Sequence, residues 1–112
     1  MENDVDGVKL PYQLIPVLAL DEIVQVLEFG RKKYGEENWK TIEDGQVFYG
    51  AALRHIFAWK RGELVDKQTS IDHLAHAVCN LLFLQELKYI RKEKEIGRKE
   101  DKENEDHKTD PS

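Results

Sequence analysis

The chain has a single cysteine, Cys79, among its 112 residues, so no disulfide can form within it. A lone cysteine inside an apolar segment favours the reducing cytoplasm over an oxidising compartment. No apolar run reaches the roughly 18 residues that a membrane-spanning helix needs. The first ten residues, MENDVDGVKL, are acidic and lack the basic and apolar regions of a signal peptide. These absences predict a soluble cytoplasmic protein.

Excess positive charge is also missing. The chain carries 17 Lys and Arg residues against 22 Asp and Glu residues, for a net charge of −5. Surfaces that bind nucleic acids or anionic membranes are usually basic, so we expect neither as a direct partner. The sequence contains no Gly-rich phosphate loop, no Cys-x-x-Cys pair, no Gly-x-Ser-x-Gly elbow and no internal repeat.

The length of the chain allows one domain. We expect an extended leader at residues 1–15, a helical domain at residues 16–96 and a charged, disordered tail at residues 97–112, where acidic and basic residues alternate. A folded part this small buries only about 60–65% of the surface of its unfolded chain. Since a second copy would cover more of that surface, we expect a homodimer.

The spacing of apolar residues predicts an all-α fold, a compact bundle of three main helices. The first helix begins near Pro16, which suits the first helical position, and ends at Gly35, which can adopt a left-handed cap conformation. The second covers residues 46–61. On the first helix, the face predicted to be buried consists of Leu20, Ile23, Val24 and Leu27.

The third predicted helix opens with Thr69 and Asp72 as a capping box and runs to about Glu95. At about 100° per residue, His73, His76 and Asn80 fall within one narrow arc of this helix. Aliphatic residues border the arc on both sides, so these polar groups are expected to face a pocket. A buried polar group without a hydrogen-bond partner lowers the stability of the folded state by about 1–3 kcal/mol. We therefore expect groups in the pocket to pair with these side chains.

A short turn, GELVDKQT at residues 62–69, joins the second and third helices. Such a turn makes the two helices antiparallel, so Glu63, Asp66 and His73 should converge at one end, while His55 meets His76 or Asn80. Helical bundles often hold metals with side chains of facing helices. Imidazoles suit zinc, manganese, iron or nickel, and carboxylates suit magnesium or manganese. The alternative at this point is a purely structural hydrogen-bonded network.

Three stretches are distinctive: KKYGEENW (residues 32–39), LRHIFAWKRGE (residues 53–63) and HLAHAVCN (residues 73–80). Together they resemble the phage-associated dATP/dGTP diphosphohydrolase N-terminal domain family, over residues 9–86. That family is counted with the MazG-like all-α nucleoside triphosphate pyrophosphohydrolases. The resemblance implies hydrolysis of a deoxypurine triphosphate to monophosphate and pyrophosphate, a divalent metal such as magnesium or manganese, and a role in the nucleotide pool during phage replication.

The chain departs from the MazG-like pattern at the expected metal ligands. MazG-like enzymes carry a Glu-x-x-Glu pair on one helix and Glu-x-x-Asp on the next, whereas this chain has His73-x-x-His76 in place of the second pair. Three explanations are open: the ion differs, with zinc, iron or cobalt suited to histidines; Glu22, Glu63 and Asp66 supply the carboxylates; or catalysis has been lost.

With the resemblance, the leading hypothesis is a metal-dependent nucleotide pyrophosphohydrolase. The alternatives are a nucleotide-binding sponge or sensor without turnover, and a structural interaction module. Trp39 or Tyr34 is expected to stack on the base. The predicted site residues are Glu63, Asp66 and His76 for catalysis, His55, Asp66, His73 and His76 for the metal, and Lys33, Tyr34, Asn38, Trp39, Arg54 and Asn80 for the nucleotide.

Overall fold

Short elements precede the first long helix in the computed structural model, which describes residues 4–5 and 8–108. Two short strands, β1 (Asp4–Val5) and β2 (Val8–Lys9), pair antiparallel. A single 3₁₀ turn, η1 (Tyr12–Leu14), then leads to α1 (Val17–Tyr34). The proposed division of the chain into leader, domain and tail stays a prediction.

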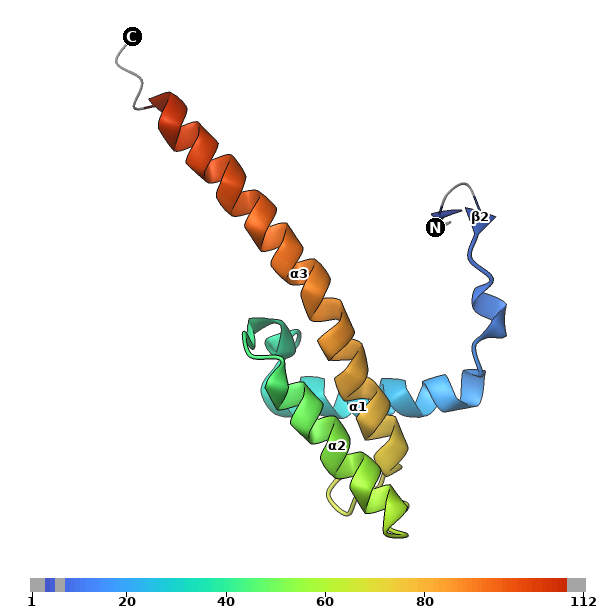
Figure 1. The fold of residues 1–112 in the computed structure, drawn as a ribbon. Coiled ribbons are helices and arrows are strands. Elements are labelled where there is room, and N and C mark those ends of the chain that lie inside the picture. The colour runs from blue at the N-terminus through green and yellow to red at the C-terminus, as the bar shows by residue number, and fades with distance from the viewer. Residues whose placement is uncertain (1–3, 6–7, 109–112) are drawn as a thin grey trace.

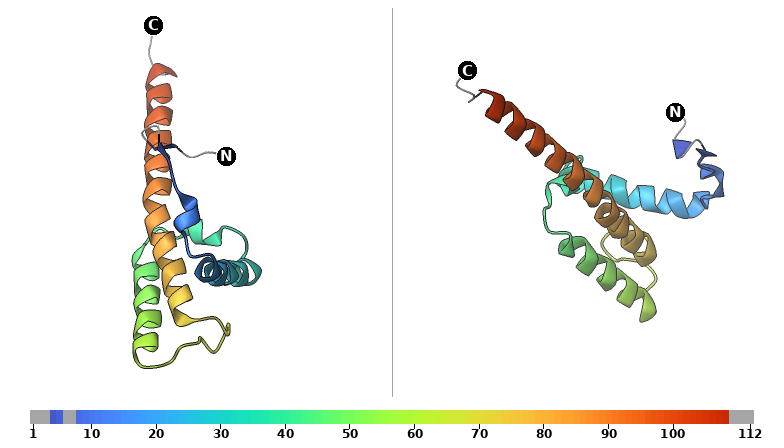
Figure 2. Two further views of the ribbon diagram at one scale, coloured as in Figure 1. Left: turned by 90° about the vertical axis from the view of Figure 1, so that its right-hand side faces the viewer. Right: turned by 45° about the horizontal axis from the view of Figure 1, so that its top comes forward.

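Two further long helices follow and complete the predicted three-helix, all-α fold, which the structure confirms. They are α2 (Gln46–Lys60) and α3 (His73–Lys108), and a second 3₁₀ turn, η2 (Asn38–Thr41), lies in the loop between α1 and α2. Helix α2 runs antiparallel beside the first half of α3, and α1 crosses α3 on another side (Figures 1 and 2). The second half of α3 extends beyond both.

Small side chains allow α2 and α3 to approach closely. Ala52 and Ala58 of α2 and Ala75 and Ala77 of α3 are all buried. Helix α1 packs on α3 through Val26, which forms a small apolar cluster with Ala75 and Cys79. The core of a single chain is therefore thin, and most of it lies along the first half of α3.

The predicted buried face of α1 is largely exposed, which corrects the sequence-based expectation. Leu20, Val24 and Leu27 are 38%, 52% and 37% exposed, and among the described residues of α1 only Val26 is buried. The spacing of these residues is helical, as predicted. The error has a physical cause: amphipathic spacing identifies an apolar face without saying which surface covers it.

Both ends of α3 also differ from expectation. The helix begins at His73, so Thr69 is not its N-cap, and it continues through Gly97 to Lys108 rather than ending near Glu95. The predicted end of α1 is confirmed, since α1 ends at Tyr34 and Gly35 has a φ of 94°. No helix in the described part of the chain is both long and apolar enough to cross a membrane.

Two adjacent aromatic residues of α2 test this packing. Phe48 is 5% exposed and Tyr49 is 49% exposed. We expect Phe48→Ala to lower the free energy of unfolding by about 3–5 kcal/mol, because it leaves a cavity. Tyr49→Ala should cost less than about 1 kcal/mol. Urea denaturation monitored by circular dichroism measures both, and equal losses would contradict the described packing.

Candidate functional site

The loop between α2 and α3 is closed by backbone hydrogen bonds. Gly62, with a φ of 96°, starts the turn, and Val65 and Asp72 form an isolated antiparallel bridge. The N–H of Asp66 donates to the carbonyl of Ile71 over 2.9 Å. This closure holds Asp66 beside the first turn of α3, so the predicted convergence of the helix end, the turn and the next helix start does occur.

Three potential metal ligands meet at this end of the helix pair. His55 of α2 and His73 of α3 face each other with their Nδ1 atoms 2.8 Å apart. One ligand atom from each of His55, Asp66 and His73 lies within 4.8 Å of the others. The carboxylate of Glu63 stands 3.9 Å from Nε2 of His73 but is itself exposed.

A threonine that the sequence analysis assigned to a helix cap organises the group. The backbone N–H and the hydroxyl of Thr69 each donate to Oδ2 of Asp66 over 3.0 Å. Nε2 of His76 lies 2.6 Å from the Thr69 hydroxyl oxygen, and the His76 ring stacks on that of His55 with centroids 4.6 Å apart. Thr69 therefore fixes the orientation of both Asp66 and His76.

The charge states of these residues suit metal binding. Burial, then the neighbouring His76 and His73, lowers the pKa of His55. Burial, then the neighbouring His73, also lowers the pKa of His76, against the opposing effect of Asp66. Burial acts to raise the pKa of Asp66, but hydrogen bonds from Thr69 and the nearby histidines outweigh it, and that pKa is lowered. Near neutral pH His55 and His76 are thus neutral imidazoles, and Asp66 is an ionised carboxylate.

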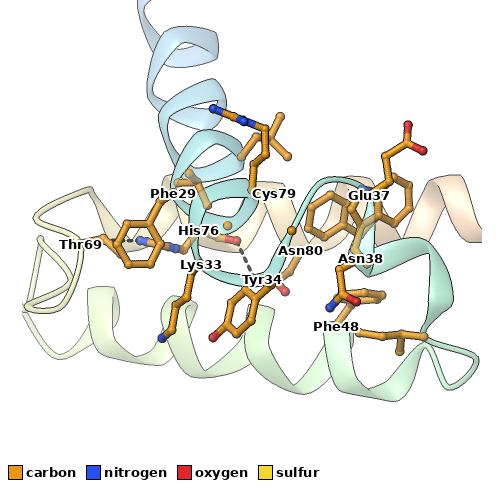
Figure 3. Close-up of a pocket in the computed structure, with 18 of the residues that line it drawn as sticks. Phe29, Lys33, Tyr34, Glu37, Asn38, Phe48, Thr69, His76, Cys79 and Asn80 are labelled. Carbon is orange, nitrogen blue, oxygen red and sulfur yellow. Dashed lines mark hydrogen bonds between the residues drawn. The ribbon is translucent and has the colours of Figure 1, made fainter.

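A cavity of about 550 Å³ opens beside this group and runs between α1, η2 and the α2–α3 pair (Figure 3). Cavities of this size accommodate small-molecule ligands. Thr69 and His76 lie at one end, and Asn38 and Phe48 at the other. Three of the polar residues described above line the cavity: His55, Asp66 and His76. Five of the six predicted nucleotide contacts also line it: Lys33, Tyr34, Asn38, Trp39 and Asn80.

Four residues singled out in the sequence do not line the cavity: His73, Glu63, Arg54 and Glu22. The predicted catalytic residue Glu63 is exposed and stands beyond His73. His73 reaches the group through its contact with His55. Arg54 is on the exposed side of α2, and Glu22 is exposed on α1. The polar arc predicted for α3 is therefore divided: His76 and Asn80 face the cavity, whereas His73 faces α2.

The aromatic residues of the cavity are partly engaged with each other. Trp39 stacks on Phe83 with ring centroids 4.5 Å apart, which occupies one face of the indole. Tyr34 is exposed, and the ammonium group of Lys33 lies 5.1 Å from its ring centroid. Tyr34 is thus the more available of the two rings that were expected to stack on a base.

Sequence reasoning missed Thr69 and Cys79 as residues of the site. The spacing Asp66-x-x-Thr69 is a signal for Thr69, because Asp side chains commonly accept hydrogen bonds from nearby backbone N–H groups in turns. Cys79 lines the cavity, but burial raises its pKa to about 11. Its thiol therefore stays protonated and is a poor nucleophile.

The family described as dATP/dGTP diphosphohydrolase, N-terminal, matches residues 2–107. The chain belongs to this family. A relative called dATP/dGTP diphosphohydrolase, from Salmonella phage PMBT28, is 32% identical over 79 residues. The match covers 70% of this chain and 27% of the relative, so the chain spans about a quarter of that protein's length. No solved structure matches the chain.

The role of Thr69 in this family member can be tested by removing its hydroxyl. Thr69→Val loses the hydrogen bonds to Asp66 and His76 and should lower the free energy of unfolding by about 1–3 kcal/mol. Thr69→Ser keeps the hydroxyl and should retain most of the stability. Urea denaturation of the metal-free protein measures both variants. An equal loss in both would mean that the methyl group, not the hydroxyl, matters.

Proposed function

We propose that this chain hydrolyses dATP and dGTP between the α- and β-phosphates, giving the monophosphate and pyrophosphate, with a divalent metal ion. Its place in the cell would be the nucleotide pool during phage replication, in the cytoplasm of the host. The observation that supports the proposal most strongly is that a group of potential metal ligands lies beside a cavity large enough for a nucleotide. The His55–Asp66–His73 group opens onto a cavity whose other residues include cations, amides and aromatic rings.

The donor set fits a divalent ion of the first transition row. Two nitrogen atoms that bind one ion at about 2.1 Å lie about 3.0–3.4 Å apart. Nδ1 of His55 and Nδ1 of His73 are hydrogen-bonded at 2.8 Å, so the two rings would share an ion after a small separation and the loss of the bridging proton. Mg²⁺ prefers a shell of oxygen ligands, whereas imidazole suits zinc, cobalt or manganese. His55, Asp66 and His73 would hold the ion.

When bound, such an ion supplies a more acidic water and offsets the charge of phosphate oxygens. The chain's own groups then supply orientation and proton transfer. Because Nε2–H of His76 donates to the Thr69 hydroxyl, which itself donates to Asp66, the free lone pair of His76 is on Nδ1. Nδ1 accepts the proton that the attacking water releases, and the carboxylate of Asp66, 3.9 Å from Nε2, stabilises the resulting imidazolium. Glu63 orients His73 from its outer side. Lys33 lines the cavity and offsets negative charge on the leaving pyrophosphate. Arg31 also lines the cavity, but its guanidinium is paired with Glu28.

A turnover assay tests the proposal directly. The protein is incubated with dATP, dGTP, dCTP or dTTP in the presence of Mg²⁺, Mn²⁺, Co²⁺ or Zn²⁺, and pyrophosphate release is measured. We expect release from the two purine nucleotides. Asp66→Asn and His55→Gln should each reduce the rate by about 100-fold or more, since each removes a ligand from the reacting end.

Asp21→Asn is the matched control, because Asp21 is an exposed carboxylate of α1 that does not line the cavity. It should leave the rate unchanged. Nucleotide binding without pyrophosphate release under every metal would contradict hydrolysis and favour the nucleotide sponge. That outcome has one observation in its favour, since Asp66 is the single carboxylate within the three-donor group.

We also propose that the protein is a homodimer, and the exposed surface supports this. The chain exposes 9256 Å², whereas a compact monomer of 13.1 kDa exposes about 6,400 Å². A standard interface needs only about 800 Å² per partner. Part of the excess belongs to the charged second half of α3. The apolar part lies on α1, where exposed residues recur at heptad-like spacing: Val17, Leu20, Val24 and Leu27.

Substitutions at two neighbouring residues of α1, one on its apolar face and one on its polar face, test the proposed dimer. Val24→Glu should convert the dimer to a monomer, because it puts a charge into the proposed interface. Gln25→Glu adds the same group on the exposed polar side and should leave the dimer intact. Size-exclusion chromatography with light scattering measures the mass. A monomeric mass for the unmodified chain at micromolar concentration would contradict the dimer.

A further inference from the structure

The cavity differs in chemistry from one end to the other. One end carries His55, Asp66 and His76, and the opposite end is walled by Phe48 and Phe83 with Trp39 stacked on the latter. The centroids of Phe48 and Phe83 are 5.3 Å apart. A nucleoside triphosphate is divided in the same way, with charged phosphates at one end and a flat aromatic base at the other. Its orientation in the cavity follows, with the phosphates toward the histidines and the base toward the aromatic rings.

Asn80 lies between these two ends, one helical turn beyond His76 (Figure 3). Its side-chain N–H donates to the backbone carbonyl of His76 over 2.8 Å. Because a carbonyl can only accept, this bond fixes which atom of the amide faces the helix. The other atom, Oδ1, is turned away from that carbonyl, and no described residue donates a hydrogen bond to it. Asn80 is half-buried and lines the cavity.

We propose that Asn80 is a specificity-determining residue whose Oδ1 accepts a hydrogen bond from the 6-amino group of an adenine base. Guanine carries an oxygen at this position and its amino group at C2, so in the same orientation it offers no donor to Oδ1. The inference rests on the proposed nucleotide site, and it adds which atom recognises which part of the substrate. A partly buried acceptor left without a donor is costly, so a nucleotide that lacks the amino group is disfavoured.

Binding of non-hydrolysable nucleotides tests this independently of turnover. The probes are the α,β-methylene triphosphates of deoxyadenosine and of purine 2′-deoxyriboside, which lacks the amino group, measured by isothermal titration calorimetry with Mn²⁺. The unmodified protein should bind the adenine probe at least about tenfold more tightly. Asn80→Leu, of similar size but without the acceptor, should bind both probes equally, at the weaker affinity.

Asn80→Asp is the matched control, since it keeps an acceptor oxygen toward the cavity and loses only the N–H that donates to the carbonyl of His76. Its added charge should weaken both probes by a common factor while the preference for the adenine probe remains. Circular dichroism checks that all variants are folded. If Asn80→Leu weakens both probes equally, or weakens neither, the proposal is overturned.

A third probe, the 2′,3′-dideoxyadenosine analogue, distinguishes the base from the sugar. If its affinity is insensitive to Asn80→Leu, the 3′-hydroxyl is the donor and the proposal is wrong. Failure of the proposed function gives a different pattern. Selective binding without hydrolysis of dATP would contradict turnover while supporting the role of Asn80, and absence of nucleotide binding in every variant would overturn both.

Discussion

The contact between the imidazoles of His55 and His73 is the constraint on which the rest of the site depends. It joins α2 to α3 at a nitrogen–nitrogen distance of 2.8 Å, and it forms because a short, internally bonded loop makes the two helices antiparallel. Buried alanines on both helices permit the close approach. The same loop delivers Asp66, whose carboxylate completes the three-donor group. A change in the length of this loop would therefore alter every distance in the site.

Local patterns in the sequence predict much of this arrangement. Helical periodicity predicts the three helices, Gly35 predicts the end of α1, and the spacing of His76 and Asn80 predicts that they share a face, which lines the cavity. The failures have a common cause, because they depend on contacts distant in sequence. Thr69 is a residue type that often caps helices, but its hydroxyl forms hydrogen bonds with Asp66 and His76. Likewise, amphipathic spacing marked Leu20, Val24 and Leu27 as apolar without identifying what covers them.

Imidazoles stand where the MazG-like sequence pattern has carboxylates, which changes the chemistry that the site can support. MazG-like enzymes, which the sequence resembles, hold magnesium with carboxylate pairs. In this chain the corresponding spacing is His73-x-x-His76, and burial lowers the pKa of His55, one of the proposed ligands, so that ring is neutral near pH 7. Neutral imidazole is a ligand for transition metals rather than for magnesium. The proposed nitrogen donors would therefore favour a different ion, which is one of the three explanations that the sequence leaves open.

In the proposed site, His55 and His73 bind one divalent ion together with Asp66, and the roles of the other residues depend on that ion. Pulsed electron paramagnetic resonance of the Mn²⁺-loaded protein measures this directly, because nitrogen ligands produce hyperfine couplings that oxygen ligands lack. We expect couplings from two imidazole nitrogens in the unmodified protein, and from one in His55→Gln and in His73→Gln. A spectrum without nitrogen couplings, or one that neither substitution changes, would contradict the account.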